Sequence, residues 1–394
     1  MYMNKSLSKQ TGFTIVELLV VIVVIGILAA ITIVSFTGIS SRAKVASIQS
    51  DLISASQRLK LFQVAEASGN YPTANNCPTP GVTEICLKAS PNNTFTIYTP
   101  NNSANPKTFT LVVTNYDSTS YNITNDSAPI AGLPPPTCAT GYLVVPGSAT
   151  YGTSDFCVMK YEAKNVGGIA TSQAASTPWV SLSQTTTITN STAACTGCHL
   201  ITEAEWLTIA QNVLGVSSNW SGGAVGSGYI YSGHNDGSPW NALAADADDN
   251  NGYYGTGNVA TSSQRRTLTL SNGEVIWDFA GDVYEWTQST IAGSQQPGLS
   301  GESSYAYKQW NNGSLLQNGL PANAMPGYTG ISGASGWSSA QGIGQLYSNY
   351  GEAVAHSYVR SGCFYNNANA GVLALFLNNT AAYWNNDVGF RVSK

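Results

Sequence analysis

The stretch that decides the fold is Gly12 to Val34, GFTIVELLVVIVVIGILAAITIV, which follows a short amino-terminal segment of residues 1–11. From residue 13 to residue 34, Glu17 is the only ionisable side chain. About 22 helical residues, rising about 1.5 Å each, can cross a hydrocarbon core of about 30 Å. The sequence therefore predicts a membrane helix at residues 13–34.

The carboxylate of Glu17 is expensive in lipid unless a specific partner neutralises it. Gly12 before Phe13, with Glu as the fifth residue after that junction and an apolar helix beyond, resembles the class III leader of type IV prepilins and pseudopilins. The resemblance implies that a membrane-embedded prepilin peptidase removes residues 1–12 and that Phe13 becomes N-methylated. It also implies that Glu17 pairs with the terminal ammonium of a neighbouring subunit during filament assembly.

An ordinary secretory signal peptide and a plain signal anchor are the alternatives for this segment. A signal peptide would be cut after its apolar stretch and would gain nothing from an acidic residue inside it. One departure from many pilins is Val34, which stands where they carry a proline, so the sequence leaves the kinking of the helix open.

The composition is poor in charge. Charged residues make up 9% of the chain, against about a quarter in ordinary soluble domains. The formal net charge is −5 and no basic stripe is present, so the sequence does not indicate a nucleic-acid partner. Abundant Gly, Asn, Ser and Thr favour an extracellular protein rich in strands and loops.

Seven cysteines follow the apolar segment, and outside the cytoplasm they favour disulfides over zinc. We expect local bridges between Cys77 and Cys86 and between Cys138 and Cys157. Cys195 and Cys198 have C-x-x-C spacing without a second such pair, which argues against a metal site. Cys363 is either free or joined to one of that last pair.

Residues 35–126 have the pattern of a helical spine that carries a small sheet. Apolar residues recur in steps of three and four, typical of one helix face, at Val45, Ile48, Leu52, Ala55, Leu59 and Phe62. The helix should end near Gly69, before Pro72. Three segments rich in β-branched and aromatic residues predict strands at 94–98, 108–114 and 120–124. This is the architecture expected of a pilin-like head.

A proline-rich linker, SAPIAGLPPPT, is predicted at residues 127–137. A second domain, residues 138–394, should begin with strands at 141–146 and 156–162. Its clearest helix follows Leu200, because Thr202 can cap the helix and Glu205 can complete a capping box. Long loops rich in glycine and asparagine occupy most of the remainder.

Six separated motifs in this second domain resemble the formylglycine-generating enzyme and sulfatase-modifying factor family, a variant of the C-type lectin fold. They are Phe156–Glu162, Pro178–Ser181, Leu200–Trp206, Gly281–Trp286, Arg360–Gly362 and Gly389–Arg391. The resemblance implies a loop-rich α+β domain over residues 138–394. The places of that family's two catalytic cysteines correspond to Asn366 and Gly371, so we expect no enzymatic activity. We expect the isolated His199, His234 and His356 to be surface or packing residues.

Calcium is a further implication of this resemblance. Members of the family bind it through the segment that matches Gly281–Trp286, where Asp282 and Glu285 could supply oxygen ligands. The alternative is that Glu285 satisfies buried backbone groups while its aromatic neighbours pack.

The carboxyl-terminal stretch is dominated by asparagine and aromatic residues, a composition shared with antibody paratopes. The predicted ligand-binding residues are Tyr365, Asn366, Asn367, Asn369, Asn378, Asn379, Tyr383, Trp384, Asn385 and Asn386. The stretch also resembles the variable segment of diversity-generating retroelement proteins, which the C-type lectin fold displays. The alternative is that these asparagines only close turns and satisfy loop backbone.

The sequence thus predicts an α+β protein with a long membrane and spine helix, a small pilin-like sheet and a lectin-type domain. We expect it to be anchored in the inner membrane by a single pass and then to join a periplasmic or extracellular filament with other pilin or pseudopilin subunits. Its function would be to display a non-catalytic adhesin domain for a protein or glycan on a surface. The alternatives are a pseudopilin of a type II secretion system and a retroelement-diversified protein.

Overall fold

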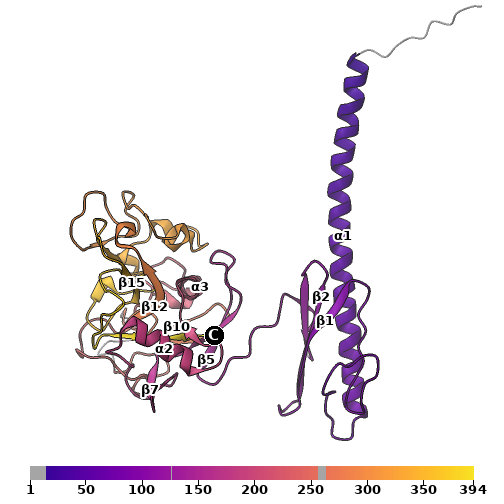
Figure 1. Cartoon of the computed structure of the whole chain (residues 1–394), viewed down its shortest axis with the longest axis horizontal. Coiled ribbons are helices and arrows are strands. Elements are labelled where there is room, and N and C mark those ends of the chain that lie inside the picture. Colours follow the sequence, from indigo (N-terminus) through magenta and orange to yellow (C-terminus); the bar gives the residue numbers. More distant parts are fainter. Residues whose placement is uncertain (1–14, 126, 256–262) are drawn as a thin grey trace, which may run out of the picture. The chain divides into compact units, whose positions relative to one another are not determined.

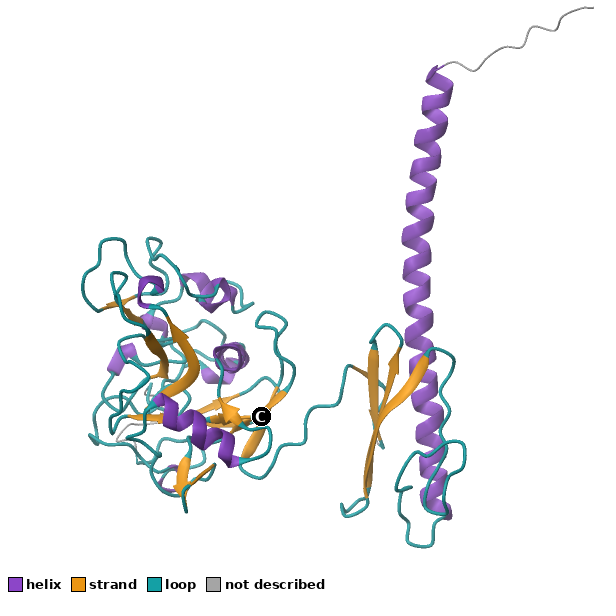
Figure 2. Cartoon of the chain, in the orientation of Figure 1, coloured by secondary structure: helices purple, strands orange, loops and turns teal. Residues whose placement is uncertain are grey.

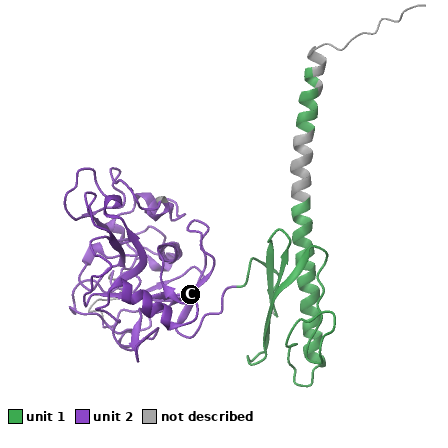
Figure 3. Cartoon of the chain, viewed as in Figure 1, with its two compact units in different colours: residues 1–134 green, residues 135–394 purple. Residues whose placement is uncertain are grey.

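The computed structural model describes residues 15–125, 127–255 and 263–394. Gly12 and Phe13, the predicted processing residues, lie outside the described residues, as does the side chain of Glu17 within the first helix. The chain is a mixed α+β protein in two compact units, residues 1–134 and 135–394 (Figure 3). The boundary between the units falls within the run of three prolines.

A single helix, α1 (Ile15–Ala65), forms the spine of the first unit (Figure 1). The middle of the predicted stripe is its buried face, since Ile48, Leu52, Ala55 and Leu59 are all at most 3% exposed. Val45 and Phe62, at the two ends of the stripe, are half-buried. The helix ends slightly before the predicted stop at Gly69. In the part of the chain that the structure describes, no helix is long and apolar enough to cross a membrane, and the predicted span at 13–34 includes positions outside that part.

The sheet of the first unit is antiparallel, with the order β1-β2-β3-β4. Its strands are β1 (Asn93–Asn101), β2 (Thr108–Asn115), β3 (Ser120–Thr124) and β4 (Ile130–Ala131). Alternate residues of β2, Phe109, Leu111 and Val113, are buried against the stripe of α1 in one apolar core. The first three strands match the prediction. β4 differs from it, because Ile130–Ala131 pair with β3 although the sequence predicted a linker there.

The second unit is built mainly from loops around short strands (Figure 2). Its largest sheet has the order β13-β14-β16-β15-β12-β17, in which β12 pairs with β17 and β14 with β16 in parallel and the other pairs are antiparallel. These strands are β12 (Tyr284–Ile291), β13 (Ala306–Lys308), β14 (Leu346–Ser348), β15 (His356–Ser361), β16 (Leu375–Phe376) and β17 (Val388–Phe390).

A four-stranded sheet has the order β5-β6-β18-β9, and two two-stranded ribbons join β7 to β8 and β10 to β11. The strands are β5 (Tyr142–Val145), β6 (Phe156–Met159), β7 (Lys164–Val166), β8 (Ile169–Thr171), β9 (His199–Leu200), β10 (Thr267–Thr269), β11 (Val275–Trp277) and β18 (Val392–Ser393). Short 3-10 helices occur at Ser217–Asn219, Ala245–Ala247, Gly293–Gln295, Ala322–Ala324, Pro326–Tyr328, Ala334–Gly336, Ser339–Gln341 and Asn367–Asn369.

The helices of the second unit are α2 (Gln184–Ala194) and α3 (Glu203–Leu214). The predicted capping box of α3 is confirmed: Glu205 N–H donates to Thr202 Oγ1 over 3.2 Å, and Thr202 N–H donates to Glu205 Oε2 over 2.9 Å. The sequence did not predict α2, whose run of threonines has poor helix propensity. Its start is fixed by Ser183, whose side chain accepts a hydrogen bond from the Thr186 N–H.

The expected local disulfides are present, joining Cys77 to Cys86 and Cys138 to Cys157. The C-x-x-C pair, Cys195 and Cys198, also closes on itself. Cys363 is therefore left as a free, fully buried thiol, and burial raises its pKa to about 12. A thiol with so high a pKa is protonated at neutral pH and is a poor nucleophile.

Replacing Thr202 with alanine should destabilise the second unit by about 1 kcal/mol, because the helix loses its side-chain cap. All nine tryptophans lie in this unit, so their fluorescence during urea unfolding of the detergent-solubilised full chain reports on it alone. Thr202→Ser keeps the hydroxyl and should unfold at the wild-type urea concentration. Equal midpoints for the alanine variant and the wild type would show that the cap is dispensable.

A candidate ligand-binding site

Six side chains, one from each strand of the largest sheet, line a pocket in the second unit. They are Tyr307, Tyr347, Phe376, Val359, Tyr284 and Val388, named in the order of the strands across the sheet. Tyr307 lies opposite Tyr347, which lies opposite Phe376, which lies opposite Val359. Because residues in register point to the same face of a sheet, pairing places these rings in one row.

The rings of this row touch one another. The Tyr307 and Tyr347 ring centroids are 4.6 Å apart, and the Tyr284 and Phe376 rings meet edge to face at 4.7 Å. Such aromatic pairs are favourable beyond the area they bury. The row is therefore a rigid apolar floor whose shape is set by the sheet.

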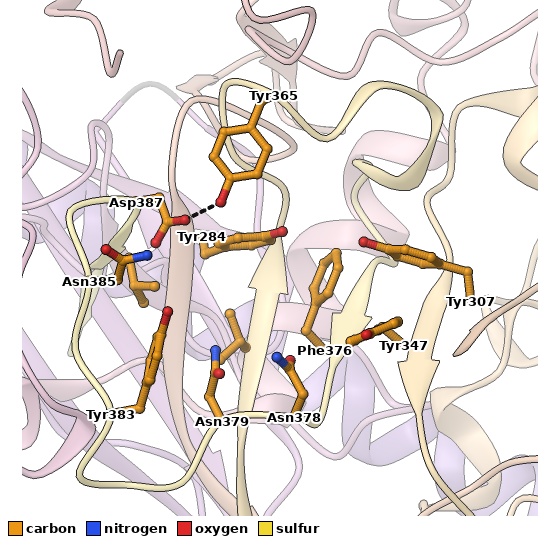
Figure 4. A pocket seen from close by; sticks show the side chains of 12 residues that line it. Tyr284, Tyr307, Tyr347, Tyr365, Phe376, Asn378, Asn379, Tyr383, Asn385 and Asp387 are labelled. Atoms are coloured by element: carbon orange, nitrogen blue, oxygen red, sulfur yellow. Dashed lines mark hydrogen bonds between the residues drawn. The ribbon is translucent and has the colours of Figure 1, made fainter. Parts of the chain in front are cut away.

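The polar half of the pocket comes from loops. The loop between β16 and β17 supplies Asn378, Asn379, Tyr383, Asn385 and Asp387, and the loop after β15 supplies Tyr365. Figure 4 shows the Asn378 and Asn379 side chains pointing toward Tyr284 and Phe376. The pocket has a volume of about 190 Å³. Its size and its mixture of rings and amides suit a small polar group presented by a larger ligand.

Asp387 is the acidic group of this pocket, and its residue is 3% exposed. The Tyr365 hydroxyl donates a hydrogen bond to Asp387 Oδ2. Burial raises the pKa of the Asp387 carboxyl, and the Tyr365 hydrogen bond opposes that shift. The second oxygen, Oδ1, is buried and has no hydrogen-bond partner within the described residues. The pocket thus holds an acceptor that a ligand can satisfy.

The structure brings five of the ten predicted ligand-binding residues into this pocket: Tyr365, Asn378, Asn379, Tyr383 and Asn385. Asn386 lines an adjoining hollow with Asn385, and Asn367 lines a separate one beside Tyr229 and Ser232. Trp384 is 66% exposed.

Asn366 does not fit the predicted role. It is 6% exposed, and its side-chain oxygen accepts a hydrogen bond from the Cys363 N–H over 2.8 Å. It therefore holds the backbone of its loop, which is the alternative role that the sequence left open. The Asn369 backbone is used similarly, since its carbonyl accepts from the Gln345 N–H.

Sequence reasoning missed Tyr307, Tyr347, Phe376 and Asp387, and Tyr284 was assigned only to packing. Tyr307 and Tyr347 lie in three-residue strands that are separated by residues 309–345, a segment of loops and short 3-10 helices. No local pattern marks such strands, and only the register of the sheet brings their rings together.

The predicted calcium ligands, Asp282 and Glu285, do not act together in the structure. Both oxygens of Glu285 accept hydrogen bonds from Arg391, at 2.9 and 3.3 Å. Asp282 instead groups with Glu162 and Asp278, three buried carboxylates with one oxygen each within 4.8 Å of the others.

This carboxylate cluster also does not fit a calcium ion. Both carboxylate oxygens of Asp278 accept hydrogen bonds from Arg266, at 2.6 and 2.8 Å. The unpartnered oxygens of Asp282 and Glu162 face cations, Arg266 at 3.6 Å and Lys164 at 3.8 Å. Calcium takes six to eight oxygen ligands, and positive side chains at this distance repel it. The cluster instead pairs buried carboxylates with buried cations.

The three histidines have structural contacts. His234 and His356 are buried, and His199 Nε2 lies 3.0 Å from Glu205 Oε1 of the capping box. The hydrogen bond to Glu205 raises the pKa of His199.

The amino-terminal region carries a pilin- or pseudopilin-type leader. Residues 7–33 match the model of the Prokaryotic N-terminal methylation motif, which confirms the leader predicted from Gly12, Phe13 and Glu17. A stretch of 71 residues is 32% identical to the type II secretion system core protein G of Escherichia coli (strain K12). That stretch is 18% of this chain and 48% of the relative, so the chain spans about half the length of the curated protein it matches.

The buried carboxylates predict a pH-dependent stability. Burial, followed by the neighbouring Asp282 and Asp278, raises the pKa of Glu162 well above its ordinary value of 4.5. Protonated Glu162 therefore contributes stability that is complete below pH 4.5 and is lost as the pH rises through the raised pKa. Glu162→Gln should reduce this decline by up to about 1.4 kcal/mol per pH unit.

The measurement is the urea midpoint of the full chain from pH 4.5 to pH 8, followed by tryptophan fluorescence. Glu274→Gln, which changes an exposed carboxylate of the same unit, is the matched control and should keep the wild-type slope. A Glu162→Gln slope equal to that of the wild type would show that Glu162 is ionised throughout.

Proposed function

We propose that the chain is a pilin-like surface protein whose second unit binds a ligand on a target surface, without catalysis. The observation that carries the proposal is the aromatic and amide pocket, in which Asn378 and Asn379 meet rings fixed by four strands of the largest sheet. The leader supports delivery, because a methylation-type leader accompanies assembly of pilin and pseudopilin subunits. A prepilin peptidase and other subunits are then the partners, and the inner membrane holds the chain before assembly.

The second unit is proposed to be the lectin-type display domain that its six motifs resemble. The proposal that the unit lacks the cysteine chemistry of the resembled family rests on the two positions that match its catalytic cysteines. Asn366 is committed to the Cys363 backbone, and a Cβ on Gly371 would lie 2.2 Å from the Ile343 carbonyl carbon. Gly371 also has φ +154°, so a cysteine there would be both strained and without space.

A pseudopilin of a type II secretion system is the second candidate, favoured by the similarity to core protein G. In that role the pocket would contact exported cargo instead of a foreign surface. The two functions differ in what fails when the chain is deleted, attachment in the first and secretion in the second.

Replacing Tyr383, Trp384 and Asn385 together with alanine should lower attachment of cells to their target surface at least about tenfold, because a few central aromatic and polar contacts carry most binding energy. Tyr383 and Asn385 line the pocket and Trp384 is exposed beside them, so the change removes ligand contacts without opening a core. The measurement is a count of attached cells. Tyr328→Ala, on an exposed ring elsewhere in the unit, is the control. Unchanged attachment by the triple variant would refute the binding role.

Immunogold electron microscopy with antibodies against residues 138–394 tests the location. Label should decorate filaments or their tips and should disappear with Glu17→Ala, because the helix loses the charge that pairs with a neighbouring subunit. Arg58→Ala, an exposed change on the same helix, should keep the label. Intact wild-type filaments without label, with label confined to the envelope, would contradict display on a pilus and favour the secretion pseudopilin.

A further inference from the structure

We infer that the pocket is one of two adjoining subsites for a neutral oligosaccharide, and that Trp240 is the stacking platform of the second. This inference rests on the proposed binding function and names its ligand class. The second hollow has a volume of about 320 Å³. Its lining residues are Trp240, Asn241, Ala242, Phe364, Tyr365, Asn385, Asn386 and Asp387.

Three residues, Tyr365, Asn385 and Asp387, line both hollows. The two hollows therefore adjoin at these side chains. A chain of linked rings that occupies both subsites would lie against these three residues at its middle. A single ring can occupy only one of them, so binding should strengthen with the length of the ligand.

Trp240 is 69% exposed, yet its ring is held in place. It stacks on Tyr365 with centroids 4.8 Å apart and an interplanar angle of 13°, and it meets the Phe364 ring edge to face at 6.1 Å. A Cβ on Gly237 would lie 2.9 Å from the indole, so the ring also lies close over that glycine. An exposed indole ordered before binding offers contact area at a low entropic cost.

The polar groups of the site match hydroxyls. Within the described residues, the side-chain amides of Asn378 and Asn379 make no hydrogen bond, and Asp387 Oδ1 has no partner. An amide both donates and accepts, and a sugar hydroxyl does the same, whereas the apolar face of a sugar ring packs on an aromatic ring.

Charge favours a neutral ligand. Among the described residues, neither hollow is lined by lysine, arginine or histidine, so nothing there would pair with an anionic group. A cationic peptide would depend on Asp387 for a negative charge, but this carboxyl is buried and burial raises its pKa, which disfavours the charged form. The side-chain amides of Asn378, Asn379 and Asn385 match hydroxyls better than an ammonium group. An ammonium group only donates hydrogen bonds, so the amide NH2 donors would find no acceptor on it.

The test uses the detergent-solubilised full chain on an array of neutral oligosaccharides of one to four hexose or N-acetylhexosamine units. At least one disaccharide or longer glycan should bind at least about tenfold more tightly than its own monosaccharide. Trp240→Ala should remove this gain, and Trp240→Phe should retain most of it. Tyr328→Ala is again the control, since its ring is exposed but lines neither hollow.

Two results would overturn the inference while leaving the proposed function intact. One is a loss of attachment in the Tyr383, Trp384 and Asn385 variant when no neutral glycan binds, or when lysine- and arginine-rich peptides printed on the same array bind instead. The other is a length-dependent gain that survives in Trp240→Ala. Failure of the proposed function itself would appear separately, as normal attachment by that triple variant.

Discussion

The second unit depends on the buried ion pair between Arg391 and Glu285. Both side chains are 0% exposed, and the remaining donors of Arg391 bind the carbonyls of Met159 and Trp277, each at 2.9 Å. One guanidinium thus joins β12, the carboxyl-terminal segment, β6 and β11. The strands of this unit are short, and at this junction the four hydrogen bonds of one guanidinium connect them. Removing one partner from such a pair typically costs 3–5 kcal/mol because the other charge stays buried.

The same pair sets the geometry of the pocket. Successive residues of a strand point to opposite faces of the sheet. In β12, Glu285 points to the face where Arg391 lies, so its neighbour Tyr284 points to the opposite face. Arg391 follows β17 directly, and β17 pairs with β12 in parallel so that Tyr284 lies opposite Val388. Both of these residues line the pocket. A buried ion pair outside the pocket therefore fixes where a ring that lines the pocket lies.

What could be predicted from the sequence was local. Three features could be predicted because their residues are close in sequence and have a recognisable spacing. They are the capping box at Thr202, the stripe of α1 and the disulfide between Cys77 and Cys86. The composition of the carboxyl-terminal stretch indicated that its asparagines could bind a ligand. Composition alone could not distinguish Asn366, whose side chain binds the Cys363 backbone, from Asn378, which lines the pocket. The floor of the pocket was missed because sheet register, which no local pattern encodes, brings Tyr307 beside Tyr347.

The pocket has two parts that differ in their importance to the fold: the rings on the strands and the amides on the loop. Its rings belong to paired strands, so replacing one of them disturbs the sheet and the core behind it. Its amides belong to the loop between β16 and β17. Within the described residues, the side-chain amides of Asn378 and Asn379 make no hydrogen bond, so replacing these two residues removes no hydrogen bond of the fold. Retroelement diversification, one of the alternatives that the sequence left open, would therefore disturb the structure little at these two asparagines and strongly at the tyrosines of the sheet.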